Sequence, residues 1–262
     1  MNAGKQPYSG DAARASSDAA PGTGLHRPVI ATVMLVALLS LFFSAGFWQL
    51  GRADEKTAIL ERFATATADG LITELVPDEA AAALRFRTIR LTGRYRPDRQ
   101  ILLDNMTDGG GSGYQVLTPF ETGGNTVLVN RGWVRADPDR TVLPAITVGD
   151  GQRTILARIN SFPAPGLRLE QPAVGGSGWP RRLLFPTAAE PAGVLAVELP
   201  AYQLQLMADQ PDGYLRDWQA VDSGPEKHLG YAFQWFSFAA LACIFYALLM
   251  TQWFRARRAA GL

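Results

Sequence analysis

The sequence predicts an α+β membrane protein in which two transmembrane helices flank a β-rich extracytoplasmic domain. Two long stretches, residues 28–51 and 229–254, contain no Asp, Glu, Lys or Arg. The segment between them holds short runs rich in β-branched and aromatic residues, separated by clusters of Gly, Pro, Asp and Asn. Such spacing is typical of an antiparallel sheet or a partly closed barrel.

The uncharged stretches are long enough to cross a membrane. With 24 and 26 residues, they would form helices of roughly 36 and 39 Å, against a hydrocarbon core of about 30 Å. Small residues at Ser44–Gly46 would suit cleavage of a signal peptide. However, the first stretch is longer than a usual signal core and follows a polar leader, which disfavours cleavage. We therefore expect transmembrane helices at residues 28–51 and 228–254.

The leader, residues 1–27, is rich in Ala, Ser, Gly and Pro, and we expect it to be disordered in the cytoplasm. Asp11 and Asp18, together with few arginines, argue against a mitochondrial transit peptide.

Basic residues beside the spans set the predicted orientation. Three precede the first span, and the tail, residues 255–262, contains three arginines. The positive-inside rule places both termini in the cytoplasm and residues 52–227 outside. The net charge is only +1, and no basic stripe alternates with aromatic residues, so no nucleic-acid partner is expected.

Within the extracytoplasmic domain, the spacing of Ile59, Leu60 and Phe63 predicts that the first helix continues out of the membrane, and Gly70 could end it. We expect strands within residues 85–96, 100–105, 113–121, 125–134 and 152–162, then a helix within 187–199 and a strand within 201–207. The stretch TDGGGSGY, residues 107–114, lacks the lysine of a phosphate-binding loop and is expected to be a hairpin loop.

Three motifs contain candidate binding residues. In NTVLVNRGWV, residues 125–134, Arg131 lies two positions before Trp133. It could stack on an aromatic ring, donate to a carboxylate or, as spacing alone favours, lie solvated on an edge strand. At the exit of the first span, Trp48, Arg52 and Lys56 form one helical ridge. This ridge could meet an anionic group at the membrane surface or simply anchor the helix to lipid headgroups.

The third motif, EKHLGYAFQWF at residues 226–236, places His228, Tyr231 and Trp235 on one face of the second helix, with Ala232 and Ala239 on the same side. An imidazole can bind haem iron axially, and flat rings beside small residues can admit a planar apolar molecule. The alternative is a histidine that hydrogen-bonds a lipid headgroup. His26, the other histidine, lies across the membrane and cannot be a second ligand in the same chain.

Several classes of protein are disfavoured by missing residues. The only cysteine, Cys243, lies in the second span, so a thiol-based copper chaperone and covalently attached haem are excluded. With both histidines at membrane boundaries, a Ser–His hydrolase is not expected, and nothing in the sequence indicates an enzyme.

Several motifs, in register, resemble the surfeit-locus-protein-one family of cytochrome c oxidase assembly factors. They lie at the first helix exit (residues 46–56), in LTGRY and GYQVLTPF, in VLVNRGWV, and in HLGYAFQWF at the start of the second span. The resemblance extends over residues 46–254. It implies maturation of the large subunit of the haem-copper oxidase, within respiratory chain biogenesis.

For a bacterial member, the resemblance implies a cell inner membrane protein with a periplasmic central domain. It implies haem a as a transiently bound cofactor, His228 as ligand to the haem iron, and cytochrome c oxidase subunit I, haem a synthase and membrane lipid as partners. Tyr231 and Trp235 are expected to pack on the macrocycle. From charge and location, Arg52, Lys56 or Arg131 are expected to meet its propionates.

Two other functions remain open at this point. A haem-free scaffold would stabilise oxidase assembly intermediates through the β-rich domain and the Trp/Arg ridges. A quinone- or haem-dependent enzyme would need redox turnover and a second set of ligands.

Overall fold

The protein is seen as a computed structural model that describes residues 26–66, 70–163, 178–184, 187, 189–221, 223–259 and 261. Residues 1–25 of the leader therefore lie outside the described part. The chain divides into two units, one formed by Met1–Ala53 with Pro225–Leu262 and the other by Asp54–Gly224. Helix α1 (His26–Thr65) contributes to both units.

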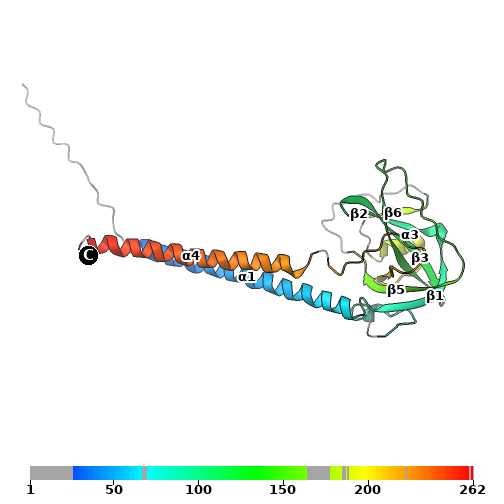
Figure 1. Cartoon of the computed structure of the whole chain (residues 1–262), viewed down its shortest axis with the longest axis horizontal. Helices are drawn as coiled ribbons and strands as arrows, with labels where there is room; N and C mark the ends of the chain where they lie inside the picture. Colours follow the sequence, from blue (N-terminus) through cyan, green and yellow to red (C-terminus); the bar gives the residue numbers. More distant parts are fainter. Residues whose placement is uncertain are drawn as a thin grey trace, which may run out of the picture. The chain divides into compact units, whose positions relative to one another are not determined.

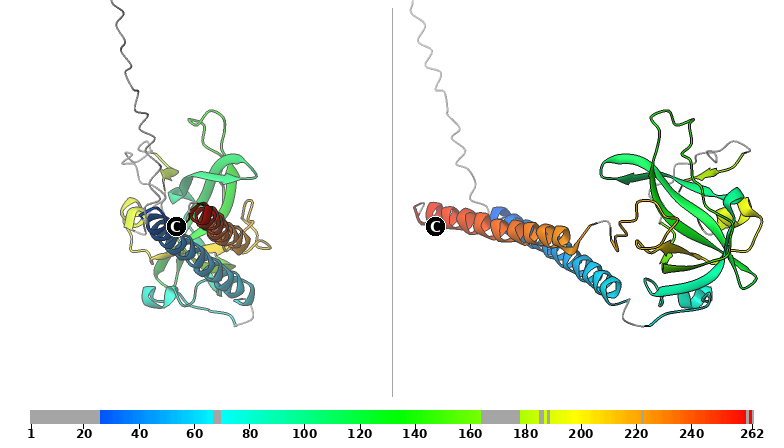
Figure 2. Two further views of the ribbon diagram at one scale, coloured as in Figure 1. Left: turned by 90° about the vertical axis from the view of Figure 1, so that its left-hand side faces the viewer. Right: turned by 45° about the vertical axis from the view of Figure 1, so that its right-hand side comes forward.

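The first unit is a pair of long helices. Helix α1 has 40 residues and α4 (Pro225–Ala259) has 35, and both are long and apolar enough to cross a membrane. The two lie side by side in opposite directions (Figures 1 and 2), with Thr32 bonded to Tyr246 near one end and Gln49 to His228 near the other. Large apolar side chains such as Phe233, 76% exposed, cover the outer faces, as expected for helices surrounded by lipid.

The second unit is built on one seven-stranded sheet. Its strands are β1 (Thr88–Tyr95), β2 (Ile101–Asp108), β3 (Gly111–Thr122), β4 (Asn125–Arg135), β5 (Arg153–Ser161), β6 (Arg181–Leu183) and β7 (Tyr202–Leu206). The strand order is β1-β5-β7-β4-β3-β2-β6. An additional pairing of β1 with β3 closes β1, β5, β7, β4 and β3 into a five-stranded barrel.

The barrel encloses the largest apolar core, which includes Ile89, Phe120, Val127, Val129 and Leu204, all fully buried. Closure requires a very close approach at Gly93 of β1, where a Cβ atom would lie 2.1 Å from the carbonyl oxygen of Glu121 in β3. Only glycine leaves room for this crossing. The sequence predicted an antiparallel sheet or a partly closed barrel, and the pairing of β1 with β3 closes that barrel.

Short helices and turns complete the unit. They are α2 (Asp78–Ala81), the 3-10 helix η1 (Pro97–Arg99) and α3 (Ala189–Leu195). The stretch TDGGGSGY forms the tight β2–β3 hairpin, with positive φ at Gly109 and Gly110, as two-residue hairpin turns require. The predicted hairpin loop is therefore confirmed.

The predicted strands and the helix within residues 187–199 are all present, but two features were not predicted. Strand β6 was missed because it has only three residues. It pairs parallel to β2, and β7 pairs parallel to β4, so the sheet is not purely antiparallel. Parallel pairing is possible because both strands follow connections that are not hairpins.

Candidate functional site

His228 and Gln49 form a polar contact between α4 and α1. The Nδ1 atom of His228 lies 2.8 Å from the amide oxygen Oε1 of Gln49. Gln49 is buried, with 9% of its surface exposed, and His228 is half-buried. A buried amide in an apolar helix needs a partner, and the imidazole provides one.

This contact defines the state of the imidazole. An amide oxygen accepts hydrogen bonds and does not donate them, so Nδ1 of His228 donates its hydrogen to Gln49. The lone pair of a neutral imidazole is then on Nε2. No hydrogen bond to Nε2 is found within the described residues. Nε2 of His228 is therefore available to a metal. In metal-binding histidines, a hydrogen bond from the other ring nitrogen usually fixes the tautomer and the ring orientation, and Gln49 accepts such a bond here.

Small residues let the two helices approach closely beside this contact. Ala232 and Ala239 are 2% and 3% exposed and lie on the side of α4 that faces α1. On α1, Gly46 is buried against the ring of Phe236, where an added Cβ would lie 2.7 Å from two ring atoms. From the sequence, these alanines lie on the face of the second helix that could admit a planar apolar molecule. In the structure, helix α1 covers them.

The predicted aromatic partners of His228 have different surroundings. Trp235 packs on Phe42 of α1, with 6.0 Å between ring centroids. Tyr231 is 45% exposed, one helical turn from His228. Tyr231 thus presents its ring beside His228 on an open surface, whereas Trp235 contributes to the packing between the helices.

The charged ridge of α1 is present on one continuous helix. Trp48 is 61% exposed, while Arg52 and Lys56 are half-buried. Arg52 belongs to the helix pair, and Lys56 belongs to the unit that contains the barrel. Within the described residues, the structure shows no group of three or more His, Cys, Asp or Glu side chains that could hold a metal ion, so His228 is a single candidate ligand.

Arg131 is buried in the barrel unit, with 1% of its surface exposed. Its Nε donates to the carbonyl oxygen of Asp212 at 2.6 Å, its Nη1 to Oε1 of Gln100 at 2.9 Å, and its Nη2 to the carbonyl oxygen of Thr147 at 2.8 Å. The solvated edge arginine that spacing favoured is therefore wrong. The five donors of guanidinium allow one side chain to join β4 to three other segments.

Two tyrosine rings complete the surroundings of Arg131. Its guanidinium lies 5.6 Å from the ring centroid of Tyr95 and 5.0 Å from that of Tyr214. Arg131 thus lies over aromatic rings, as one alternative from the sequence allowed, but the rings are those of two tyrosines and not that of Trp133. Burial raises the pKa of Tyr95 to about 12, although the nearby Arg131 opposes this shift. With its donors engaged inside the barrel unit, Arg131 has a structural role.

Comparison with known proteins identifies the family. The SURF1 family, or surfeit-locus-protein-one family, matches residues 36–240, which is most of the chain. The chain belongs to the SURF1 family. This family is linked to oxidase assembly and is a family of assembly factors rather than of enzymes. The resemblance that the motifs indicated is thereby confirmed.

Relatives from two bacterial genera are similar over most of their length. Uncharacterised SURF1-like proteins of Mycobacterium bovis and Mycobacterium tuberculosis are each 32% identical over 239 residues, covering 86% of this chain and 84% of the relative. A SURF1-like protein of Rickettsia conorii is 25% identical over 221 residues, covering 80% of this chain and 86% of the relative.

Gln49 is the functional candidate whose role sequence reasoning missed. Its signal in the sequence is a polar side chain inside an otherwise apolar span, three residues before Arg52. Such a residue needs a partner within the membrane. Pattern alone could not identify that partner, because His228 is 179 positions away.

Proposed function

We propose that the protein binds haem a through Nε2 of His228 and assists its insertion into the large subunit of cytochrome c oxidase. The single observation that supports this role is the hydrogen bond from Nδ1 of His228 to Gln49, which leaves Nε2 without a described partner. Family membership supports the link to oxidase assembly. Haem a is the cargo here and is bound only transiently.

The arrangement suits a carrier that must release its cargo. One histidine supplies one axial position and leaves the other to a ligand from a partner protein. Gln49 keeps the imidazole in the required tautomer, which raises its basicity as a ligand. The exposed ring of Tyr231 would pack on the macrocycle. The positive charges of Arg52 and Lys56 would pair with the haem propionates. Haem a synthase, as donor, and oxidase subunit I, as acceptor, would be the partners.

Orientation follows from the charges beside the spans. With basic residues at both ends, both termini would lie in the cytoplasm and the barrel in the periplasm, with the helices in the inner membrane among lipid. His228 would then lie near the periplasmic end of α4.

The first experiment tests the contribution of Gln49 to haem binding. Apoprotein in lipid nanodiscs is titrated with haem a, and Gln49→Leu is compared with wild type. Loss of the hydrogen bond between His228 and Gln49 should weaken haem a binding by about 10- to 100-fold. It should also shift the iron–histidine stretching frequency of the ferrous state. Gln234→Leu is the matched control, because this glutamine of α4 is exposed.

Wild-type affinity and an unchanged stretching frequency in Gln49→Leu would contradict the role of this contact. A change in Gln49→Leu that also occurred in Gln234→Leu would show only a general effect of removing an amide from the span.

A haem-free scaffold is the second candidate, and one observation favours it. Ala232 and Ala239 are covered by α1, so they do not offer the open floor expected for a macrocycle. A scaffold would contact oxidase helices through exposed aromatic side chains such as Phe47, Trp48 and Phe233. His228→Ala separates the two functions in cells: a scaffold would still support oxidase assembly, whereas a carrier would yield an oxidase deficient in haem a.

A further inference from the structure

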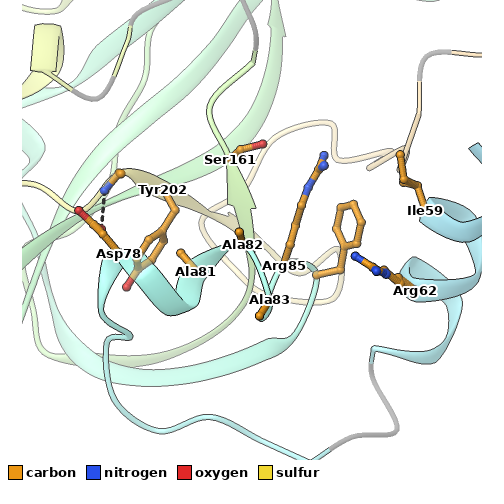
Figure 3. A pocket seen from close by; sticks show the side chains of 11 residues that line it. Ile59, Arg62, Asp78, Ala81, Ala82, Ala83, Arg85, Ser161 and Tyr202 are labelled. Carbon is orange, nitrogen blue, oxygen red and sulfur yellow. Dashed lines mark hydrogen bonds between the residues drawn. The ribbon is translucent and has the colours of Figure 1, made fainter. Parts of the chain in front are cut away.

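A pocket of about 370 Å³ lies in the barrel unit, between the end of α1 and the segment around α2. Figure 3 shows Ile59 and Arg62 reaching it from α1, Ala81–Ala83 and Arg85 from the segment before β1, and Ser161 and Tyr202 from β5 and β7. The walls are mainly apolar, formed by Ile59, the three alanines and the ring of Phe86. The volume is within the range of small-molecule sites, at its lower end.

Arg85 is a partly desolvated cation in this pocket. Its Nε donates to Oδ1 of Asn160 at 2.8 Å, and its guanidinium lies 4.5 Å from the centroid of the Phe86 ring. Burial lowers the pKa of Arg85, because the charged form loses hydration. Across the described residues, no carboxylate forms an ion pair with Arg85 and no acceptor is bonded to its Nη1 or Nη2. Its terminal donors are therefore available to an anion.

The acidic residue in the pocket is already engaged. Asp78 accepts a hydrogen bond from the backbone nitrogen of Ala201 at 2.8 Å, drawn as a dashed line in Figure 3. Tyr202 is likewise engaged, because its hydroxyl bonds to the backbone of Val76. Asp78 and Tyr202 lie together at one end of the pocket, away from Arg62 in the view of Figure 3. Among the residues that the structure describes, no carboxylate therefore pairs with Arg85 or Arg62.

Further arginines reinforce the positive charge. In Figure 3, Arg62 extends from α1 toward the segment that contains Arg85. Phe86 of the pocket wall packs on the ring of Phe63, with 5.2 Å between centroids. Arg158 lies 4.0 Å from the centroid of the Phe63 ring, and its buried Nε has no partner within the described residues. Burial also lowers the pKa of Arg158. An anion in the pocket would offset the desolvation that Arg85 and Arg158 share.

We propose that this pocket binds an anionic amphiphile, with its carboxylate or phosphate group on Arg85 and Arg62 and its apolar part along Ile59, Ala81–Ala83 and Phe86. Ser161 offers a hydroxyl at the same wall. The proposal is independent of haem binding by His228, since every residue that it uses belongs to the unit Asp54–Gly224. Ligands of this class have an anionic head group and an apolar chain or ring, whose burial in the pocket is favourable.

The test uses the full chain in nanodiscs of phosphatidylcholine and three probes with the same chain: dodecanoate, dodecyl phosphate and dodecanol. Binding is measured by calorimetry, with inorganic phosphate as a head-only probe. We expect both anions to bind at least tenfold more tightly than dodecanol, because charge-assisted hydrogen bonds are the stronger ones. Inorganic phosphate should bind far more weakly than dodecyl phosphate. Stronger binding of the phosphate probe would indicate a phospholipid as the source, and stronger binding of the carboxylate a fatty acid.

Variants locate the site. Arg85→Gln and, separately, Arg62→Gln should each lower anion affinity about tenfold, whereas Arg90→Gln, at an exposed position of β1, should not. Arg62 is exposed and makes no described side-chain contact, so its variant should fold even if Arg85→Gln does not. Equal affinity for dodecanol and the anions, absence of binding by all three probes, or unchanged affinity in Arg62→Gln would overturn the proposal.

Discussion

At the scale of single residues, Arg131 shows how a polar side chain can hold a β domain together. It donates to carbonyl or amide oxygens of Gln100, Thr147 and Asp212, which lie in three segments outside β4. Removing such a donor leaves buried acceptors without partners, and each costs about 1–3 kcal/mol. The same geometry explains why lysine, which has the same charge, would not replace arginine here.

We predict that Arg131→Lys destabilises the barrel unit by about 3 kcal/mol, because an ammonium group cannot reach the same three acceptors. This corresponds to a drop in Tm of about 6–12 °C for a unit of this size. The Tm is measured by near-ultraviolet circular dichroism of the full chain, with Arg90→Lys as control for an exposed arginine. A Tm within 2 °C of wild type, about the shift that one kcal/mol would cause, would contradict the structural role.

Tyr95 gives a prediction that depends on pH. Its ring is buried and its hydroxyl has no partner within the described residues. Because burial raises its folded-state pKa to about 12 from an unfolded value near 10, its neutral form favours the folded state. This contribution is complete below pH 10 and is lost as the pH rises through about 12.

Accordingly, Tyr95→Phe should be as stable as wild type at pH 7, since no hydrogen bond is lost, and more stable than wild type at pH 11. Urea denaturation of the full chain at the two pH values measures the difference. A variant that lost as much stability as wild type between pH 7 and pH 11 would show that Tyr95 does not cause the decline.

At the scale of elements, the contact between α1 and α4 depends on small residues. Gly46 is the tightest point, because a Cβ there would meet the Phe236 ring at 2.7 Å. Without a hydrophobic effect between helices in lipid, close packing is a main source of their association. A large side chain at this position should therefore separate the helices and break the bond between Gln49 and His228.

The variant Gly46→Leu should lower the thermal stability of the helix pair in nanodiscs and weaken haem a binding. Gly51→Leu is the matched control, because nothing lies within 4 Å of a Cβ at that position. Differential scanning calorimetry and haem titration provide the two measurements. Equal behaviour of both variants would mean that the Gly46 contact does not hold the helices together.

Most elements could be predicted because their signals are local. The long uncharged stretches, the β-rich runs bounded by Gly, Pro, Asp and Asn, and the glycines of the hairpins are all read within a few residues. Closure of the barrel depends on the approach of Gly93 to Glu121, which lie in strands separated by β2, so no local pattern reports it. For the same reason, the burial of Arg131 and the bond between Gln49 and His228 became visible only with the fold.

At the scale of the whole molecule, the proposed topology places the barrel in the periplasm. It is tested with single-cysteine variants, Asn125→Cys and Ala256→Cys, each with Cys243→Ser, in intact cells treated with a membrane-impermeant maleimide. Both positions are exposed. We expect labelling at residue 125 and none at residue 256 until the cells are broken. The opposite pattern would invert the orientation and place His228 on the cytoplasmic side.

The central claim is that His228 holds haem a, and the visible spectrum of the purified protein tests it most directly. The chain is produced in cells that make haem a, and wild type is compared with His228→Ala at equal membrane insertion. Our account predicts the absorption bands of haem a in the wild type and their loss in the variant. A colourless wild type, or a variant that retains the same bands, would contradict it.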